Sequence, residues 1–296
     1  MVQVREKIEN KEKLVQKIQR SLQQLTDSAR KNINRTDPES VKAKGRQGTH
    51  ACYNVQINTD NKHGIIVQAE AMSQNNDLNL LKDQLEKSAE NLGKKATTAC
   101  SDSGYNSTEH LLQIDEEIKL IVPSQQQAQK EKEQYISNPF DKEQFVYDQP
   151  RDEDICPEGK RLTYQGLDRK KQLKKYKATA KDCQGRQHFG VCTSSRAGRT
   201  MSRHLREDFK RKLENIYASP EGQEIYQLRK QKVEHPFGHM KRNLGAGQFM
   251  LRGKTKVDAE FDLINTLQYC SDDNDYRNTS VDHEAQRQLK RNVLNF

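Results

Sequence analysis

The stretch KATTACSDSGYNSTEHLLQIDEEIKLIV (Lys95–Val122) contains the succession of elements that decides the fold. Lys95–Ser101 predicts a short strand, Ser107–Gln113 a short helix, and Ile118–Val122 a second strand. Strands that alternate with helices are typical of an α/β layer fold, in which helices cover a sheet. Asp102 comes directly after the first strand, where α/β folds place ligands and catalytic groups. A turn or helix-cap role suits this Asp equally, so the stretch alone leaves both interpretations open.

The segments upstream extend this pattern. Cys52–Met72 predicts a β-hairpin, because Val55 and Ile57 alternate with polar residues before a turn-rich sequence. Leu78–Leu92 has leucines at helical spacing and predicts a helix. Val2–Asn32 predicts a longer helix with a loose apolar stripe, which packs on one side only or acts as a spacer.

The segments downstream are more polar. Gln125–Gln149 predicts an irregular region, and Ile155–Tyr164 and Leu173–Ala178 predict short strands joined by basic loops. Glu207–Tyr217 and Val257–Tyr269 predict helices, the second of them amphipathic.

Composition favours a polyanionic partner. The 296 residues include 51 Lys and Arg against 42 Asp and Glu, a net charge of +9, and Lys160–Asn215 has 17 bases and 5 acids. Apolar residues make up only 32% and the mean hydropathy is −1.09, so part of the chain is extended or its core is completed by something else. The sequence has no membrane span or signal peptide, and its six scattered cysteines favour a reducing, cytoplasmic setting.

A second informative stretch is YQLRKQKVEHPFGHMKRN (Tyr226–Asn243), which has five bases and one acid, Glu234. On a regular helix, Lys230, Glu234 and Lys241 would share one face. A carboxylate among bases is how a metal-dependent nucleic-acid enzyme presents a ligand, but a surface Glu paired within its own helix fits as well. Pro236 predicts an interruption of the helix just after this Glu.

Two segments, SDSGYNSTEHL (Ser101–Leu111) and Arg229–Tyr269, resemble bacterial insertion-sequence transposases with a DDE catalytic domain of ribonuclease-H-like fold. CYNVQINTD (Cys52–Asp60) is similar to a hairpin of that family, and CPEGKRLTY (Cys156–Tyr164) to an inserted cysteine-bearing module. The resemblance implies an α/β protein with an incomplete ribonuclease-H-like mixed sheet flanked by helices and a basic, cysteine-bearing, β-rich insertion.

The resemblance also implies the site and its chemistry. Asp102 and Glu234 would be catalytic and would ligate a pair of Mg²⁺ ions, which prefer oxygen ligands and activate the nucleophile and leaving group of a phosphodiester. DNA contacts would come from four bases: Lys230, Lys241, Arg242 and Arg252. The expected partner is double-stranded DNA at transposon ends, with a homo-oligomer possible and no membrane.

The implied organisation has five segments. They are a helical spacer (1–35), the first part of the catalytic domain (36–124), the cysteine-bearing insertion (125–206), the helical part with the catalytic Glu (207–272) and a polar tail (273–296).

The sequence departs from the family at two points. The family's first catalytic Asp has no counterpart, and Asp37 and Asp60 are poor substitutes, so the chain resembles the C-terminal portion of a transposase that is inactive alone. The family's zinc set of cysteines is also incomplete. Cys156, Cys183 and Cys192 remain as possible zinc ligands, but Arg186 occupies the Cys-x-x-Cys partner position, and His188 is the nearest replacement.

Three functions compete on this evidence. The first is a DDE transposase, and the second is a non-catalytic DNA-binding remnant that occupies transposon ends or pairs with full-length transposase. The third, an RNA-binding protein, is disfavoured because no pattern of aromatic base-stacking residues is visible.

Overall fold

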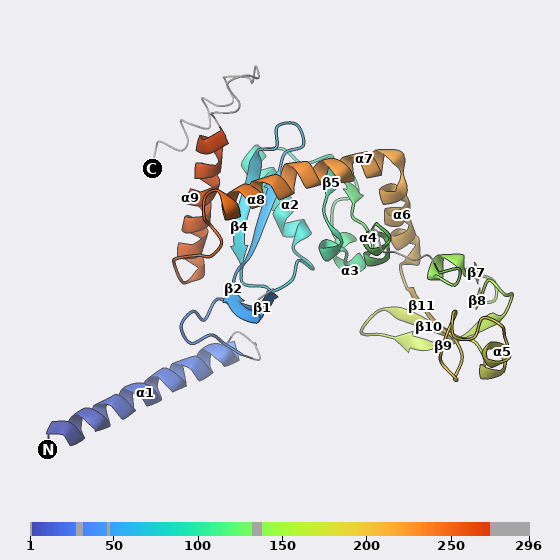
Figure 1. Ribbon diagram of the computed structural model, residues 1–296, viewed down its shortest axis with the longest axis horizontal. Coiled ribbons are helices and arrows are strands. Elements are labelled where there is room, and N and C mark those ends of the chain that lie inside the picture. The colour runs from blue at the N-terminus through green and yellow to red at the C-terminus, as the bar shows by residue number, and fades with distance from the viewer. Residues whose placement is uncertain (1, 28–31, 46–47, 132–137, 273–296) are drawn as a thin grey trace. The chain divides into compact units, whose positions relative to one another are not determined.

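A computed structural model describes residues 2–27, 32–45, 48–131 and 138–272 (Figure 1). Side chains at 2–9, 45, 230 and 269–272 are outside the description. The chain divides into two compact units: Met1–Asp77, Asp83–Lys95 and Leu228–Phe296 form unit 1, and Leu78–Lys82 and Ala96–Gln227 form unit 2.

Unit 1 contains α1 (Val2–Asp27), β1 (Val41–Gly45), β2 (Gly48–Cys52), β3 (Asn54–Thr59), β4 (Ile66–Met72), most of α2 (Leu81–Leu92), the π-helical turn Lys230–Glu234, α8 (His235–Arg242) and α9 (Lys254–Asp272). Unit 2 contains β5 (Thr98–Cys100), α3 (Thr108–Leu111), β6 (Lys119–Ile121), α4 (Gln125–Lys130), β7 (Val146–Asp148), β8 (Glu153–Ile155), β9 (Arg161–Asp168), β10 (Leu173–Lys177), α5 (Ala180–Gln184), β11 (Thr200–His204), α6 (Glu207–Ala218) and most of α7 (Pro220–Arg229).

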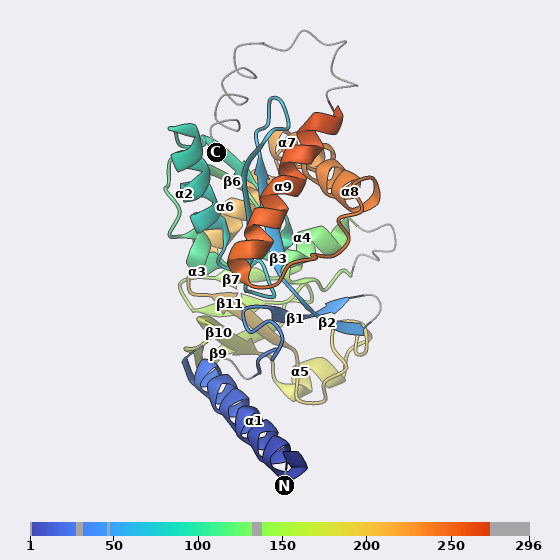
Figure 2. The same ribbon diagram turned by 90° about the vertical axis from the view of Figure 1, so that its left-hand side faces the viewer.

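The predicted hairpin is confirmed as the antiparallel pair β3–β4, and its two faces differ. Val55 and Ile57 pack with Met240 of α8 and Phe261 of α9 in an apolar core. Successive strand residues point to opposite faces, so the intervening polar residues face α2. There Asn58 donates hydrogen bonds to the Ser88 Oγ at 2.7 Å and to the Gln84 carbonyl at 3.0 Å. Figure 2 shows α2 and α9 on opposite sides of the hairpin.

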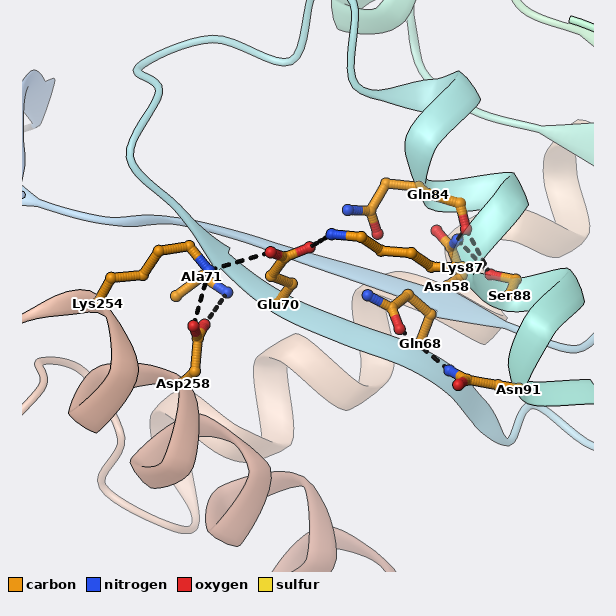
Figure 3. Close-up of polar contacts among 10 residues, drawn as sticks. All are labelled: Asn58, Gln68, Glu70, Ala71, Gln84, Lys87, Ser88, Asn91, Lys254 and Asp258. Carbon is orange, nitrogen blue, oxygen red and sulfur yellow. Dashed lines mark hydrogen bonds and ion pairs between the residues drawn. The ribbon is translucent and has the colours of Figure 1, made fainter. Parts of the chain in front are cut away.

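Glu70 of β4 connects both helices to the hairpin (Figure 3). Its carboxylate pairs with Lys87 of α2 and, at 3.0 Å, with Lys254 of α9. Asp258, one turn along α9, accepts a hydrogen bond from the Ala71 N–H at 2.8 Å. Among the described strands β4 pairs only with β3, so this carboxylate satisfies a backbone donor on the open edge of the strand.

In unit 2, the stretch Lys95–Val122 folds as strand, helix and strand, as predicted. β5 and β6 pair in parallel, with Ala99 opposite Leu120. Two parallel strands are not stable alone, and they are covered by a core in which Ile121 packs with Tyr217 and Tyr226. The rings of Tyr217 and Tyr226 meet edge to face at 5.0 Å.

Unit 2 also contains a five-stranded antiparallel sheet, in the order β11-β10-β9-β8-β7. Two strands separate β8 from β11, yet Arg203 of β11 hydrogen-bonds Asp154 of β8 through Nε at 2.8 and 2.9 Å. The Arg203 guanidinium also lies 4.5 Å from the centre of the Tyr147 ring on β7. The sheet is therefore strongly curled around its core.

The prediction that the polar region Gln125–Gln149 is irregular was wrong. The region contains α4, because Ser124 and Gln127 form a reciprocal capping box at the start of the helix. The segment also contributes strand β7 to the curled sheet. The expected tail, 273–296, lies outside the described residues.

Candidate active site

Asp102 occupies the edge of a parallel sheet in unit 2. It follows β5, is half-buried, and accepts a hydrogen bond from the Gly104 N–H at 2.8 Å, so it caps the short 3₁₀ turn Ser103–Tyr105. Asn106 at the end of this turn donates to the carbonyls of Val122 and Pro123, just past β6. The cap therefore holds Asp102 at the carboxyl edge of both strands, where ligands bind in α/β folds.

Glu234 in unit 1 ends a π-helical turn, so the helix predicted to be interrupted at Pro236 departs from regular geometry already before this Glu. Pro236 follows in the first turn of α8, and a π turn accommodates the hydrogen bond that proline cannot donate. This turn changes the helical register, so Lys230 and Glu234 do not have the predicted α-helical spacing. The Glu234 carboxylate is 60% exposed and lies 3.4 Å from the guanidinium of Arg229, the pairing within one helix that the sequence also allowed.

The predicted DNA-contacting bases all belong to unit 1. Lys241 and Arg242 are exposed in the last turn of α8, and Lys241 Nζ lies 5.7 Å from the centre of the Phe237 ring. Arg252 is exposed in the loop before α9. The Lys230 backbone lies in the π turn, but its side chain is outside the description.

Carboxylates that the sequence did not assign hold the loop around Arg252. Glu260 accepts hydrogen bonds from the backbone N–H groups of Met250 and Leu251, both at 2.8 Å. Glu39 accepts from the Lys254 N–H at 2.8 Å. The sequence could have indicated these contacts, because acidic residues near a glycine-containing loop can accept strong hydrogen bonds from its backbone N–H groups.

The two substitutes for the missing first Asp have structural contacts. Asp37 is buried and accepts hydrogen bonds from the Tyr53 hydroxyl at 2.7 Å and the Gly253 N–H at 3.3 Å. Burial and the Asp37 carboxylate raise the pKa of Tyr53 far above its ordinary value. Asp60 accepts from backbone N–H groups in the hairpin turn, including that of Ile65 at 2.7 Å.

The structure places Asp102 and Glu234 in different units, so the predicted pairing of these carboxylates stays a prediction. Over the described part of the chain, no group of three or more His, Cys, Asp or Glu side chains is arranged to hold a metal ion. Within the same residues, no helix is long and apolar enough to cross a membrane.

Comparison with curated proteins and with solved structures gave no match. Comparison with protein families gave a match over residues 155–268, which include Glu234, Arg252 and the three buried cysteines but not Asp102. The family is described as a transposase DDE domain, and its match supports assignment of this part of the chain to a DDE transposase and so to DNA transposition.

Proposed function

We propose that the chain acts in DNA transposition as part of a DDE transposase with a ribonuclease-H-like catalytic domain, encoded by a bacterial insertion sequence. The observation that carries the proposal is the family match over residues 155–268. Independent support comes from Asp102, which the fold holds at the carboxyl edge of the parallel strands β5 and β6.

The residues present supply only part of a two-metal site. Asp102 and Glu234 offer the hard oxygen ligands that Mg²⁺ prefers, and when bound the metal pair would activate the nucleophile and stabilise the leaving oxygen. The family's first catalytic Asp has no counterpart in the sequence, which leaves two carboxylates of the three that hold a pair of ions. We therefore propose that this chain alone binds duplex DNA without cleaving it, and that it occupies transposon ends or pairs with a complete transposase.

Charge supports the DNA-binding part of this proposal. Lys241, Arg242 and Arg252 are exposed, and the sequence carries a net charge of +9. Lys and Arg that neutralise phosphates release counterions from DNA, which makes the affinity strongly dependent on salt. Backbone contacts of this kind position a duplex but read little of its sequence.

The test is titration of a fluorescent duplex with the full chain at several salt concentrations. In Lys241→Ala and Arg252→Ala, we expect the slope of log K against log salt to weaken by about 0.9 for each phosphate that the variant no longer neutralises. The matched control is Lys94→Ala, an exposed lysine of unit 1 that is not among the predicted DNA-binding residues. Unchanged slopes in the test variants would contradict the proposed DNA-binding role of these bases.

A second assay tests the absence of cleavage. The chain is incubated with Mg²⁺ or Mn²⁺ and duplexes that end in the element's terminal repeats. We expect binding without strand scission. Scission that Asp102→Asn or Glu234→Gln abolishes would show that the chain is itself a nuclease, and would overturn the non-catalytic part of the proposal.

A further inference from the structure

Three buried thiols converge in the core of the curled sheet. Cys156 follows β8, Cys183 lies on α5, and Cys192 lies in the loop before β11. Their residues are at most 4% exposed, and all three belong to one apolar cluster with Phe140, Phe145, Leu162, Tyr176, Ala178 and Met201. Three thiols gathered from separate segments suggest a structural metal site of the zinc type.

A guanidinium lies between two of these sulfur atoms. Arg186 donates from Nη1 to the Cys156 Sγ and from Nη2 to the Cys183 Sγ, both at 3.5 Å. The two nitrogens belong to one rigid planar fork, so a single side chain bridges β8 and α5. A guanidinium is a cation that cannot be deprotonated at ordinary pH and has no lone pair to give a metal.

Backbone donors complete the surroundings of the sulfur atoms. The Lys160 N–H points to the Cys156 Sγ at 3.3 Å, and the Arg199 N–H points to the Cys183 Sγ at 3.4 Å. Gly159, at a φ of 74°, makes the tight turn that brings the first donor into place. N–H groups aimed at sulfur are arranged as they would be around a metal-bound thiolate.

A second arginine joins the loop of the third cysteine to this centre. Arg199 donates from Nη1 to the Cys192 carbonyl at 2.7 Å and from Nη2 to the Phe140 carbonyl at 3.3 Å. His188, the nearest replacement ligand in the sequence, is engaged elsewhere. Its Nε2 lies 3.4 Å from the Glu158 carboxylate, and its ring centre lies 5.2 Å from that of Phe140.

We infer that the Arg186 guanidinium takes the place of a metal ion at the centre of this module. The residues present do not fit zinc, because a cation occupies the space between Cys156 and Cys183 and no described residue supplies a fourth ligand. Hydrogen bonds from Arg186 to the two sulfur atoms hold the segments together as a metal ion would, and the hydrogen bonds of Arg199 support the loop of the third cysteine. The module therefore folds without metal and is insensitive to chelators.

The first test uses the unmodified full chain, purified with a thiol reductant. Elemental analysis is expected to find less than about 0.1 zinc ion per chain, against about one for a structural site. EDTA is expected to leave the thermal midpoint of unfolding unchanged. Zinc at about one ion per chain, or a midpoint that EDTA lowers, would overturn the inference.

The second test restores a ligand. Arg186→Cys creates a Cys-x-x-Cys pair with Cys183, and we expect this variant to take up about one Zn²⁺ or Co²⁺ per chain, the latter with sulfur-to-cobalt charge-transfer absorption. Gln187→Cys is the matched control, because it adds a thiol at an exposed neighbouring position. A folded Arg186→Cys chain that binds no more metal than the control would overturn the inference.

A third variant separates charge from geometry. Arg186→Lys keeps a cation but loses the two-nitrogen fork, so it is expected to lower the thermal midpoint without any gain of metal. If Arg186→Cys fails to fold, this variant and the measurements on the unmodified chain still decide the question. An Arg186→Lys midpoint equal to that of the unmodified chain would overturn the bridging role.

Discussion

The buried ion pair between Asp154 and Arg203 determines whether the five-stranded sheet keeps its curl. Both side chains are almost wholly removed from water, with exposures of 0% for Asp154 and 5% for Arg203. Their strands, β8 and β11, are not neighbours, so this pair and the stacking of Arg203 on Tyr147 connect parts of the sheet that backbone hydrogen bonds do not join.

Asp154→Ala is expected to lower the free energy of unfolding of this sheet by about 3–5 kcal/mol, because it leaves a buried guanidinium without a counter-charge. The loss in free energy of unfolding is expected to be near the lower end of this range if the Arg203 guanidinium turns toward solvent while it still stacks on Tyr147. The double variant Asp154→Leu with Arg203→Leu removes both charges and is expected to be closer to the unmodified chain than either single variant, since a buried pair adds little net stability over apolar packing.

Urea denaturation of the full chain measures these differences, with amide hydrogen exchange in β8–β11 to assign the transition to this sheet. Lys175→Ala is the matched control, because it breaks an exposed pair with Asp168, 3.3 Å apart on the same sheet, and should cost less than about 1 kcal/mol. The proposed role of the buried pair is refuted if Asp154→Ala costs no more than this control, or if the double variant is less stable than both single variants.

Three further predictions concern other elements. Burial raises the pKa of Glu70, but hydrogen bonds from two lysines outweigh this effect and hold the pKa below its ordinary value of 4.5. The ionised Glu70 carboxylate therefore stabilises the folded chain above pH 4.5, and this stabilisation is lost as the pH falls through the pKa of Glu70 in the folded state. In Glu70→Gln, the free energy of unfolding should decrease less steeply as the pH is lowered into the acid range. Urea melts at several pH values measure this dependence, and a dependence on pH equal to that of the unmodified chain would contradict the prediction. Gln84→Met should raise the free energy of unfolding by about 1–2 kcal/mol in the same melts, because no described residue forms a hydrogen bond with the buried side-chain amide of Gln84; a decrease in the free energy of unfolding would contradict this. Gly222→Ala should destabilise by at least about 1–3 kcal/mol, since its Cβ would lie 2.1 Å from the Ile216 carbonyl oxygen, whereas Gly238→Ala meets no atom within 4 Å and should stabilise by about 0.5–1 kcal/mol; thermal melts that give both changes one sign would refute the steric explanation.

The periodic spacing of apolar residues explains which strands and helices the sequence could predict. The alternation of Val55 and Ile57 with polar residues indicated the hairpin, and it also determines which face meets α8 and α9. Leucines at helical spacing predicted a helix over Leu78–Leu92, and α2 occupies Leu81–Leu92. Each of these signals lies within a few residues of the element that it predicts.

The features that the sequence did not predict depend on contacts between distant segments or on a break in periodicity. The curl of the sheet depends on Arg203 meeting Asp154, 49 residues earlier in the chain. The bridge from Arg186 to Cys156 spans 30 residues. Pro236 indicated an interruption of the helix but not its form, a π turn that changes the helical register, so a face drawn for a regular helix fails at that point.

The ion pairs of Asp154 and Glu234 differ in a way that bears on the candidate site. Asp154 cannot exchange its partner, because its buried charge would be left unpaired. Glu234 is 60% exposed and lies 3.4 Å from the guanidinium of Arg229, whose own side chain is 15% exposed. Because the Glu234 carboxylate is open to solvent, a metal ion can reach it, so the pairing seen here is compatible with the ligand role proposed for Glu234. Arg229→Ala removes a largely buried side chain as well as the ion pair, so we expect it to cost more than the loss of an exposed pair would; if the chain still folds and the proposed ligand role is correct, the variant should strengthen any Mn²⁺ binding that Glu234→Gln abolishes. Paramagnetic relaxation of water by Mn²⁺ measures that binding, and weaker binding in Arg229→Ala than in the unmodified chain would show that the pair organises Glu234 for the metal instead of competing with it.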